Sequence, residues 1–332
     1  MNKTQVYLLI SLSFFFFSCD EENASSKKNN VEVPEWTVWD LSKYNWDNSY
    51  VLNIQKTNDG KIWFSYDNYM LYIENEEVNL HVGGDTTFYE WITDFHVENK
   101  DSILVRLDGG RGIYSFNGYN WHMFEENSKI EYKGIEKFQD SYWIATFSAW
   151  NPYGIFLYKN NKLEKTELGG FAYSLKNFND EELILGFNGS VAIVEDGIIE
   201  VFNIPGNYEI GPITALERMS SGDLWVGDYL SKIIKYSNGT WELIGIPQGF
   251  LIYESDVPQY NEIVGIESDN HGNVWIATER SGLIKYDGEN WIHLTPENSN
   301  LPSEKMGFLF FDDLTGLLWI GGEDFIARHN PN

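Results

Sequence analysis

The chain has 332 residues, a hydrophobic share of 42% and a formal net charge of −27. Binding to nucleic acid or to anionic lipid requires basic patches, so this charge argues against both classes of partner. The 13 Trp, 20 Tyr and 21 Phe residues favour strands over helices.

The N-terminal residues have the pattern of an export signal. Lys3 precedes the apolar run 6–17, which is too short to span a membrane and fits the hydrophobic region of a signal peptide. Ser18 and Cys19 follow, as in a lipoprotein signal, in which Cys19 becomes the diacylated N-terminus. Phe16 departs from the usual Leu, and an ordinary signal cleaved near an incidental Cys19 is the alternative. We predict a lipoprotein signal peptide at 1–18.

The next segment reads as a tether. Residues 20–22 are acidic, which resembles a surface-export signal of some diderm lipoproteins, and residues 23–30 are polar without an apolar anchor. Cys19 is the only cysteine, so no disulfide framework is expected. We expect residues 19–33 to tether a monomeric outer-membrane lipoprotein that faces the periplasm or the cell surface, with the lipid as its only membrane contact.

A repeat occupies residues 34–330. Its mark is a large residue in the second strand of each unit, and successive marks are 39 to 50 residues apart: Trp63, Leu104, Trp143, Ile184, Trp225, Trp275 and Trp319. A period near forty with four short strands per unit is typical of propeller blades. A solenoid is the alternative, but no unit resembles a cap. We predict an all-β, seven-bladed β-propeller.

Tight turns separate the strands of each unit. Asn-Gly or Asp-Gly pairs at 117–118, 196–197, 238–239 and 287–288 suit two-residue hairpins, because these residues adopt positive φ angles. The hairpins therefore gather on one face of the disc.

The last blade lacks a strand of its own. A second Trp follows the mark by 16 or 17 residues in three blades, at Trp121, Trp241 and Trp291, and the corresponding position in the seventh blade lies beyond residue 332. Glu35-Trp36-Thr-Val38 parallels Asn290-Trp291-Ile-His293. We expect residues 36–41 to complete the last blade, which hides the edges of an open array.

The repeat resembles that of the two-component regulator propeller family. The resemblance rests on Asp269-Asn-His-Gly-Asn-Val-Trp275-Ile-Ala-Thr278 with Gly282-Leu-Ile-Lys-Tyr286, and on weaker copies around Trp143 and Trp225. The second and fourth blades are degenerate and lack the Trp. The resemblance implies an extracytoplasmic sensor domain that reads glycan breakdown products. This chain shows one propeller and no kinase, so we expect it to bind a ligand without signalling alone.

The candidate site lies on the face opposite the hairpins, because loops on a rigid scaffold carry function. Aromatic residues there could stack on sugar rings, while Arg and carboxylates could orient a ligand. Packing between blades is the alternative for the aromatic residues, and pairing with carboxylates is the alternative for the arginines. The candidates are Tyr66, Tyr69, Arg111, Trp150, Tyr153, Tyr229, Glu279 and Arg280.

No catalytic motif emerges from the sequence. None of the loops between second and third strands contains His, and neither a G-x-S-x-G nor an H-E-x-x-H motif is present. We therefore predict no catalytic residue, metal ligand or cofactor. The favoured function is binding of a glycan or other small ligand, or of a protein partner in the cell envelope. The alternatives are a lyase acting on a polysaccharide or cyclic peptide, and an acidic interaction scaffold.

Overall fold

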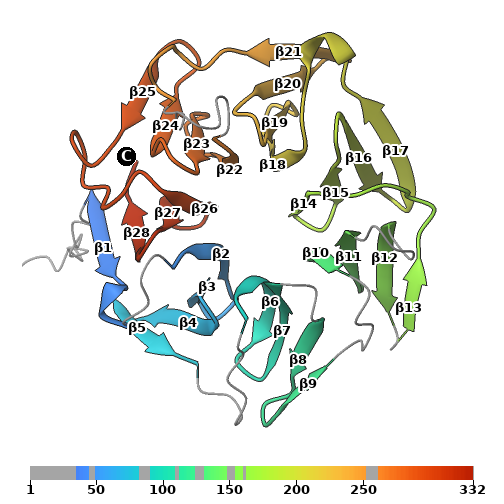
Figure 1. Cartoon of the computed structure of the whole chain (residues 1–332), viewed down its shortest axis with the longest axis vertical. Coiled ribbons are helices and arrows are strands. Elements are labelled where there is room, and N and C mark those ends of the chain that lie inside the picture. The colour runs from blue at the N-terminus through green and yellow to red at the C-terminus, as the bar shows by residue number, and fades with distance from the viewer. Residues whose placement is uncertain are drawn as a thin grey trace, which may run out of the picture. The chain divides into compact units, whose positions relative to one another are not determined.

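In a computed structural model, the described residues are 35–44, 49–81, 90–108, 112–123, 131–147, 154–159, 162–251 and 261–331. They form seven four-stranded antiparallel sheets, which surround a central channel as blades (Figure 1). The predicted seven-bladed propeller is confirmed. The predicted signal peptide and tether lie outside the described residues.

Six blades each use four consecutive strands, numbered from the channel outward. Blade 1 consists of β2 (Val51–Lys56), β3 (Ile62–Tyr66), β4 (Tyr69–Glu74) and β5 (Glu77–Leu80). Blade 2 consists of β6 (Ile92–Asn99), β7 (Ser102–Leu107), β8 (Ile113–Phe116) and β9 (Trp121–Met123). Blade 3 consists of β10 (Glu131–Phe138), β11 (Ser141–Phe147), β12 (Gly154–Lys159) and β13 (Lys162–Lys165).

The remaining blades follow in chain order. Blade 4 consists of β14 (Ser174–Phe178), β15 (Glu182–Gly186), β16 (Ser190–Glu195) and β17 (Ile198–Asn203). Blade 5 consists of β18 (Ile213–Arg218), β19 (Leu224–Asp228), β20 (Ile233–Ser237) and β21 (Thr240–Ile244), and blade 6 of β22 (Ile263–Ser268), β23 (Val274–Thr278), β24 (Leu283–Tyr286) and β25 (Trp291–Leu294). Blade 7 contains β26 (Met306–Asp312), β27 (Leu317–Gly322) and β28 (Phe325–His329). The short 3-10 helices η1 (Ser42–Tyr44) and η3 (Gly206–Tyr208) lie between blades.

Strand β1 (Trp36–Asp40), the first strand in the chain, is the outermost strand of blade 7. It pairs antiparallel with β28, in a register that runs from Trp36 opposite His329 to Asp40 opposite Phe325. The Trp36 and His329 rings stack with their centroids 4.3 Å apart. The predicted closure of the ring by residues 36–41 is confirmed, and it joins the last blade to the first part of the propeller.

The seven marks of the repeat all lie on second strands and all are buried. A second strand has a partner on both edges and a neighbouring blade on both faces, so β3, β19 and β23 are buried at every residue. The apolar clusters accordingly join adjacent blades; one contains Trp225 of blade 5 together with Ile263 and Ile276 of blade 6. The core is therefore a ring of packed blade faces.

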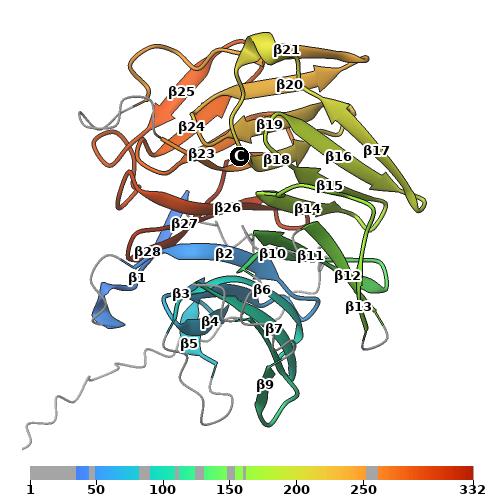
Figure 2. The same cartoon turned by 45° about the vertical axis from the view of Figure 1, so that its right-hand side comes forward.

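The hairpins follow the predicted turn chemistry in part. Both residues have positive φ at Asp196-Gly197 and at Asn238-Gly239, as a type I′ turn requires. Only the glycine does so at 117–118 and 287–288. These turns lie at the hairpin face, and in the oblique view of Figure 2 the outer strands such as β17 lie at the rim.

Candidate ligand-binding face

The face opposite the hairpins carries the loops between second and third strands and the connectors between blades; we call it the connector face. One hydrogen bond recurs there in four blades. The first residue after the second strand donates its N–H to the carbonyl of the residue before the inner strand, at 2.9 to 3.0 Å: Asp108 to Trp91, Tyr229 to Pro212, Glu279 to Glu262 and Glu323 to Lys305. The loop and the connector of each of these blades are thus fixed side by side.

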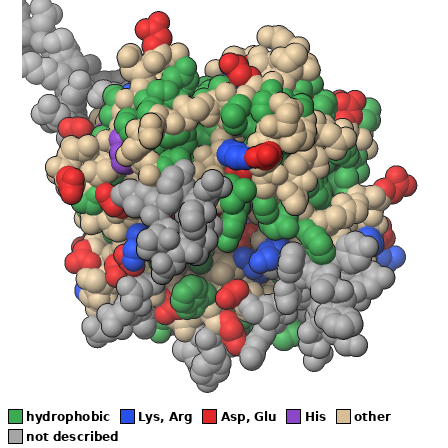
Figure 3. Space-filling view, turned by 45° about the horizontal axis from the view of Figure 1, so that its top comes forward, with side chains coloured by type: hydrophobic (Ala, Val, Ile, Leu, Met, Phe, Trp, Pro, Cys, Tyr) green, Lys and Arg blue, Asp and Glu red, His purple; other side chains and the backbone are tan. Residues whose placement is uncertain are grey.

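Charged groups of both signs gather on this face over blades 6 and 7. Arg280 Nε lies 3.5 Å from Glu279 Oε2, and Lys305 Nζ lies 2.5 Å from Glu323 Oε1. Tyr50 forms a β-bridge with Glu323. Burial raises the pKa of Tyr50, and the nearby Glu323 raises it further. Figure 3 likewise shows acidic and basic side chains next to each other on the face that it presents.

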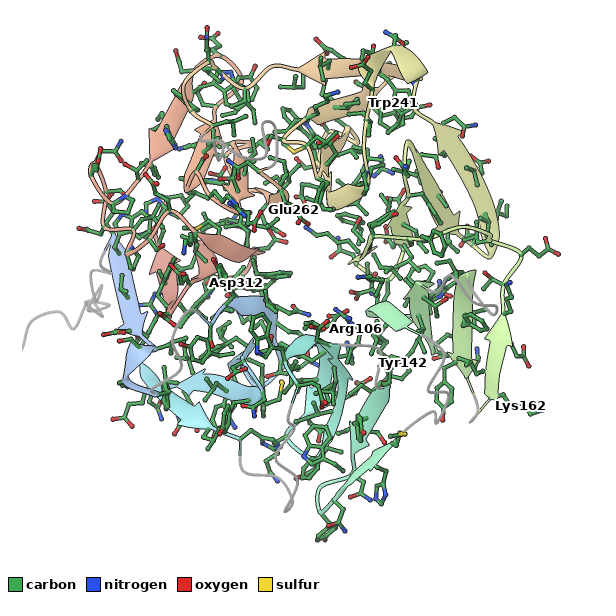
Figure 4. The ribbon with its side chains drawn as sticks, in the orientation of Figure 1. Arg106, Tyr142, Lys162, Trp241, Glu262 and Asp312 are labelled. Atoms are coloured by element: carbon green, nitrogen blue, oxygen red, sulfur yellow. The ribbon has the colours of Figure 1, made fainter. Side chains whose placement is uncertain are left out.

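Glu262 links these groups to the central channel. Burial raises its pKa to about 7, the charge of Glu279 raises it further, and Lys133 of blade 3 opposes the shift. Lys133 lines the channel from the opposite side of the ring. Figure 4 shows Glu262 beside the channel, with Arg106 on the far side. We call Tyr50, Glu262, Glu279, Arg280, Lys305 and Glu323 the charged cluster.

The channel has a volume of about 650 Å³ and is lined by the inner strands of all seven blades. At its connector end the lining is rich in neutral polar side chains, namely Asn53, Thr93, Tyr173, Ser174 and Thr214. Deeper in the channel, burial raises the pKa of Glu136 to about 8, and the charge of Asp94 adds to the shift. The channel therefore offers hydroxyl and amide groups together with the Glu136 carboxyl, whose raised pKa favours its protonated form.

Most channel charges are used to join neighbouring blades. Lys176 of blade 4 donates to Glu217 of blade 5 at 2.7 Å and to Glu267 of blade 6 at 2.6 Å. Further links around the ring are Lys56 to Asp312, Asn53 to Asp94, Asp94 to the N–H of Ile135, Asn177 to the carbonyl of Lys137, and Glu267 to the N–H of Phe311. These contacts fix the walls of the channel, because buried polar groups are costly to leave unpaired.

The structure distributes the candidate residues over different environments. Tyr229 is 38% exposed, and Glu279 and Arg280 each have about a quarter of their side chains exposed on the connector face. Tyr66 is fully buried, and its hydroxyl donates to Asp324 Oδ1 at 2.6 Å. Tyr69 is half-buried against the core of blade 1. Tyr66 thus links blade 1 to blade 7, and the role of both tyrosines in ligand binding stays a prediction.

Three further candidates, Arg111, Trp150 and Tyr153, lie outside the described residues. Conversely, sequence reasoning missed Tyr50, Glu262 and Lys305 of the charged cluster. All three immediately precede an inner strand: Tyr50 precedes β2, Glu262 precedes β22 and Lys305 precedes β26. The position just before each inner strand was the available signal, because the chain enters the blade from the connector face there.

Neither a cluster of metal-binding side chains nor a membrane-spanning helix is present in the described part of the chain. No group of three or more His, Cys, Asp or Glu side chains in these ranges could hold a metal ion. None of the helices in the same ranges has the length and apolar character needed to cross a membrane.

No protein-family model matches the sequence, and no curated protein matches it. Solved structures do resemble the propeller. The extracellular domain of the putative hybrid two-component system BT4673 from B. thetaiotaomicron matches 86% of this chain and 38% of its own length, with a TM-score of 0.65 and 16% identity. The corresponding domain of BT3049 from the same organism matches 89% and 42%, with a TM-score of 0.64 and 16% identity.

A third structure, of YCF48 bound to D1 peptide, matches 91% of this chain and 97% of its own, with a TM-score of 0.63 and 13% identity. The chain spans about two fifths of the length of the sensor domains that it resembles. The predicted likeness to sensor propellers is confirmed for the fold. The chain therefore has the seven-bladed propeller architecture found in the extracellular domains of hybrid two-component systems.

Proposed function

We propose that this chain is a non-catalytic binding protein, held at the outer membrane through a lipidated Cys19, which binds a glycan fragment on its connector face. The charged cluster over the channel mouth is the observation that carries the proposal. It brings three carboxyl groups, a guanidinium and an ammonium of blades 6 and 7 together with Tyr50, which immediately precedes blade 1.

The composition of the cluster favours a neutral ligand rich in hydroxyl groups. Two of its carboxylates are already paired with cations, and Glu262 has its pKa near 7, so the cluster carries little net charge. Carboxylates accept hydrogen bonds from hydroxyl groups, and Arg and Lys donate to them, so the same groups can orient a sugar ring. The half-exposed ring of Tyr229 adds an apolar surface on which a sugar could stack.

A protein partner is the second candidate. YCF48, which matches this chain over nearly its whole length, was solved with a bound D1 peptide. A propeller of this size can therefore bind a peptide. The likeness to extracellular domains supports a location in the cell envelope.

A glycan array tests the proposal. The Cys19→Ser variant, which cannot be lipidated, should retain at least one glycan class, and Arg280→Ala and Glu262→Gln should each weaken that binding about tenfold. Lys235→Ala is the matched control: it removes a cation that pairs with Glu242 at 3.3 Å on the outer part of blade 5. Absence of any retained glycan, or equal binding by all variants, would refute the glycan proposal.

The anchor has a separate test. Cells that express the full chain should incorporate a labelled fatty acid into it, and the Cys19→Ser substitution should abolish the label. Labelling of the variant would show that the anchor assignment is wrong.

A further inference from the structure

The outermost strand of blade 4 differs from the other outer strands of the described propeller. Strand β17 exposes three large apolar side chains: Ile198 is 63% exposed, Ile199 37% and Val201 54%. It has six residues, whereas β1, β5, β9, β13, β21 and β25 have three to five. Figures 1 and 2 both place β17 at the rim, with its outer side turned away from the ring.

An outer strand leaves every second N–H and C=O without a partner strand, so proteins usually protect such edges. Strand β13 has Lys at both ends, and β9 has only three residues. Strands β5, β21 and β25 each expose one large apolar side chain, at 44 to 47%. Strand β17 contains no Lys, Arg or Pro. It therefore combines an available backbone edge with apolar side chains.

The chain around β17 is rich in acidic residues. Residues 177–217 include eight Asp or Glu and no Lys, Arg or His. Three of these acids, Glu195, Asp196 and Glu200, are exposed in β17 or at its hairpin. By contrast, Glu182 and Glu217 are bound to Arg218 and Lys176. The exposed edge thus presents a row of apolar side chains next to negative charge.

We propose that β17 is a docking edge for an extended segment of a partner protein, in which apolar and basic side chains alternate. Such a segment would add a strand to blade 4 through main-chain hydrogen bonds. Its basic side chains would lie next to Glu200, on the face that Glu195 of β16 shares, and its apolar ones next to Ile199 and Val201. A second copy of this chain fits less well, because antiparallel self-pairing would bring like charges together on molecules of charge −27.

A synthetic peptide in which Val and Lys alternate over the length of a strand is the probe. The Cys19→Ser chain should bind it, and hydrogen exchange should slow at residues 198–203. Val201→Lys should weaken binding about tenfold, because it places a positive charge on the edge. Leu243→Lys, at the one exposed large apolar residue of the outer strand of blade 5, is the matched control and should leave binding unchanged. Val201→Lys should also leave glycan retention unchanged, which separates this edge from the connector face.

Three results would overturn the proposal. The first is equal binding by the Val201→Lys and Leu243→Lys variants, or protection confined to other residues. The second is equal binding of a peptide in which Val and Glu alternate, which would remove the role of charge. The third is sedimentation of the wild type as a dimer that Val201→Lys dissociates, which would assign the edge to a second copy.

Discussion

Blades 6 and 4 form the same four strands from very different versions of the repeat. In blade 6, Asp269 accepts four hydrogen bonds, from the N–H groups of His271 and Asn273, from the Asn273 amide at 2.7 Å and from the Trp275 indole at 2.9 Å. In blade 4, fully buried Ile184 replaces the Trp, and Asp180 binds Asn177 at the surface. The blade fold therefore requires a buried apolar residue in the second strand, and the Asp–Trp pair adds stability to it.

The two blades also use their edges differently. The outer strand of blade 6 exposes Ile292 and is four residues long, whereas that of blade 4 is longer and more apolar. Blade 4 thus combines the degenerate repeat with the exposed edge proposed above as a docking site. The predictions below test how far the two blades differ in stability.

Truncation of the marked residue of the second strand, Trp275 in blade 6 and Ile184 in blade 4, should have the largest effect on stability. Trp275→Ala should lower the free energy of unfolding by about 4 kcal/mol and Ile184→Ala by about 3 kcal/mol. Trp275 is the larger side chain, and its loss also removes a hydrogen bond to Asp269 and the ring beneath Lys285, whose Nζ lies 5.0 Å from the ring centroid. Urea titrations of both variants measure the two costs. A cost for Ile184→Ala well above that for Trp275→Ala would contradict the view that blade 6 is the better-packed copy.

Removal of the ion pair that joins the two blades should have the next largest effect. Lys176→Met should cost about 3 kcal/mol near neutral pH, because it leaves Glu217 and Glu267 without their cation. Burial raises the pKa of Glu267 to about 7, and the charge of Glu217 adds to the shift, although Lys176 opposes it. A carboxyl group with a raised pKa binds more protons in the folded state, so folding is favoured as the pH falls.

The deficit of the variant should therefore shrink as the pH falls from about 8 to about 5, because Glu267 becomes protonated over this range. Urea titrations across this range measure the change. Lys162→Met, on the exposed end of β13, is the control and should be nearly neutral at every pH. A deficit for Lys176→Met that stays constant with pH would show that the lost cation matters only through packing.

The sequence predicted the architecture well because the signals for it are local and repeated. The seven marks, the hairpin turns and the Trp36 strand each occupy a few consecutive residues, and burial of a second strand imposes the same requirement in every blade. The site is assembled from separate blades, and no single repeat contains it. Lys305 forms a salt bridge with Glu323 of its own blade. By contrast, the charge of Lys133 across the ring lowers the pKa of Glu262, and Tyr66 donates a hydrogen bond to Asp324 of another blade. Such pairings depend on how the ring closes, which the repeat pattern does not specify.

The smallest expected difference concerns the turn carboxylates. Asp269→Asn should lower the free energy of unfolding by about 1.5 kcal/mol. One carboxylate oxygen of Asp269 accepts hydrogen bonds from the Trp275 indole and the Asn273 amide, and in the variant an amide N–H group would face these donors. Asp180→Asn, in the matching turn of blade 4, should cost about 0.5 kcal/mol, since Asn tolerates its positive φ of 57° and can keep the bond to Asn177.

The cost of Asp269→Asn should also depend on pH. Burial raises the pKa of Asp269, but its hydrogen bonds with Asn273 and Trp275 outweigh burial and hold the pKa below its usual value of 3.8. A carboxyl group with a lowered pKa stabilises the fold above its unfolded pKa and loses that effect as the pH falls through its folded pKa. The cost of Asp269→Asn should accordingly be full near neutral pH and decrease below about pH 4, as thermal melts would show. Equal costs for both variants at neutral pH would mean that the Asp–Trp pair of blade 6 stabilises its hairpin no more than the surface turn of blade 4 does.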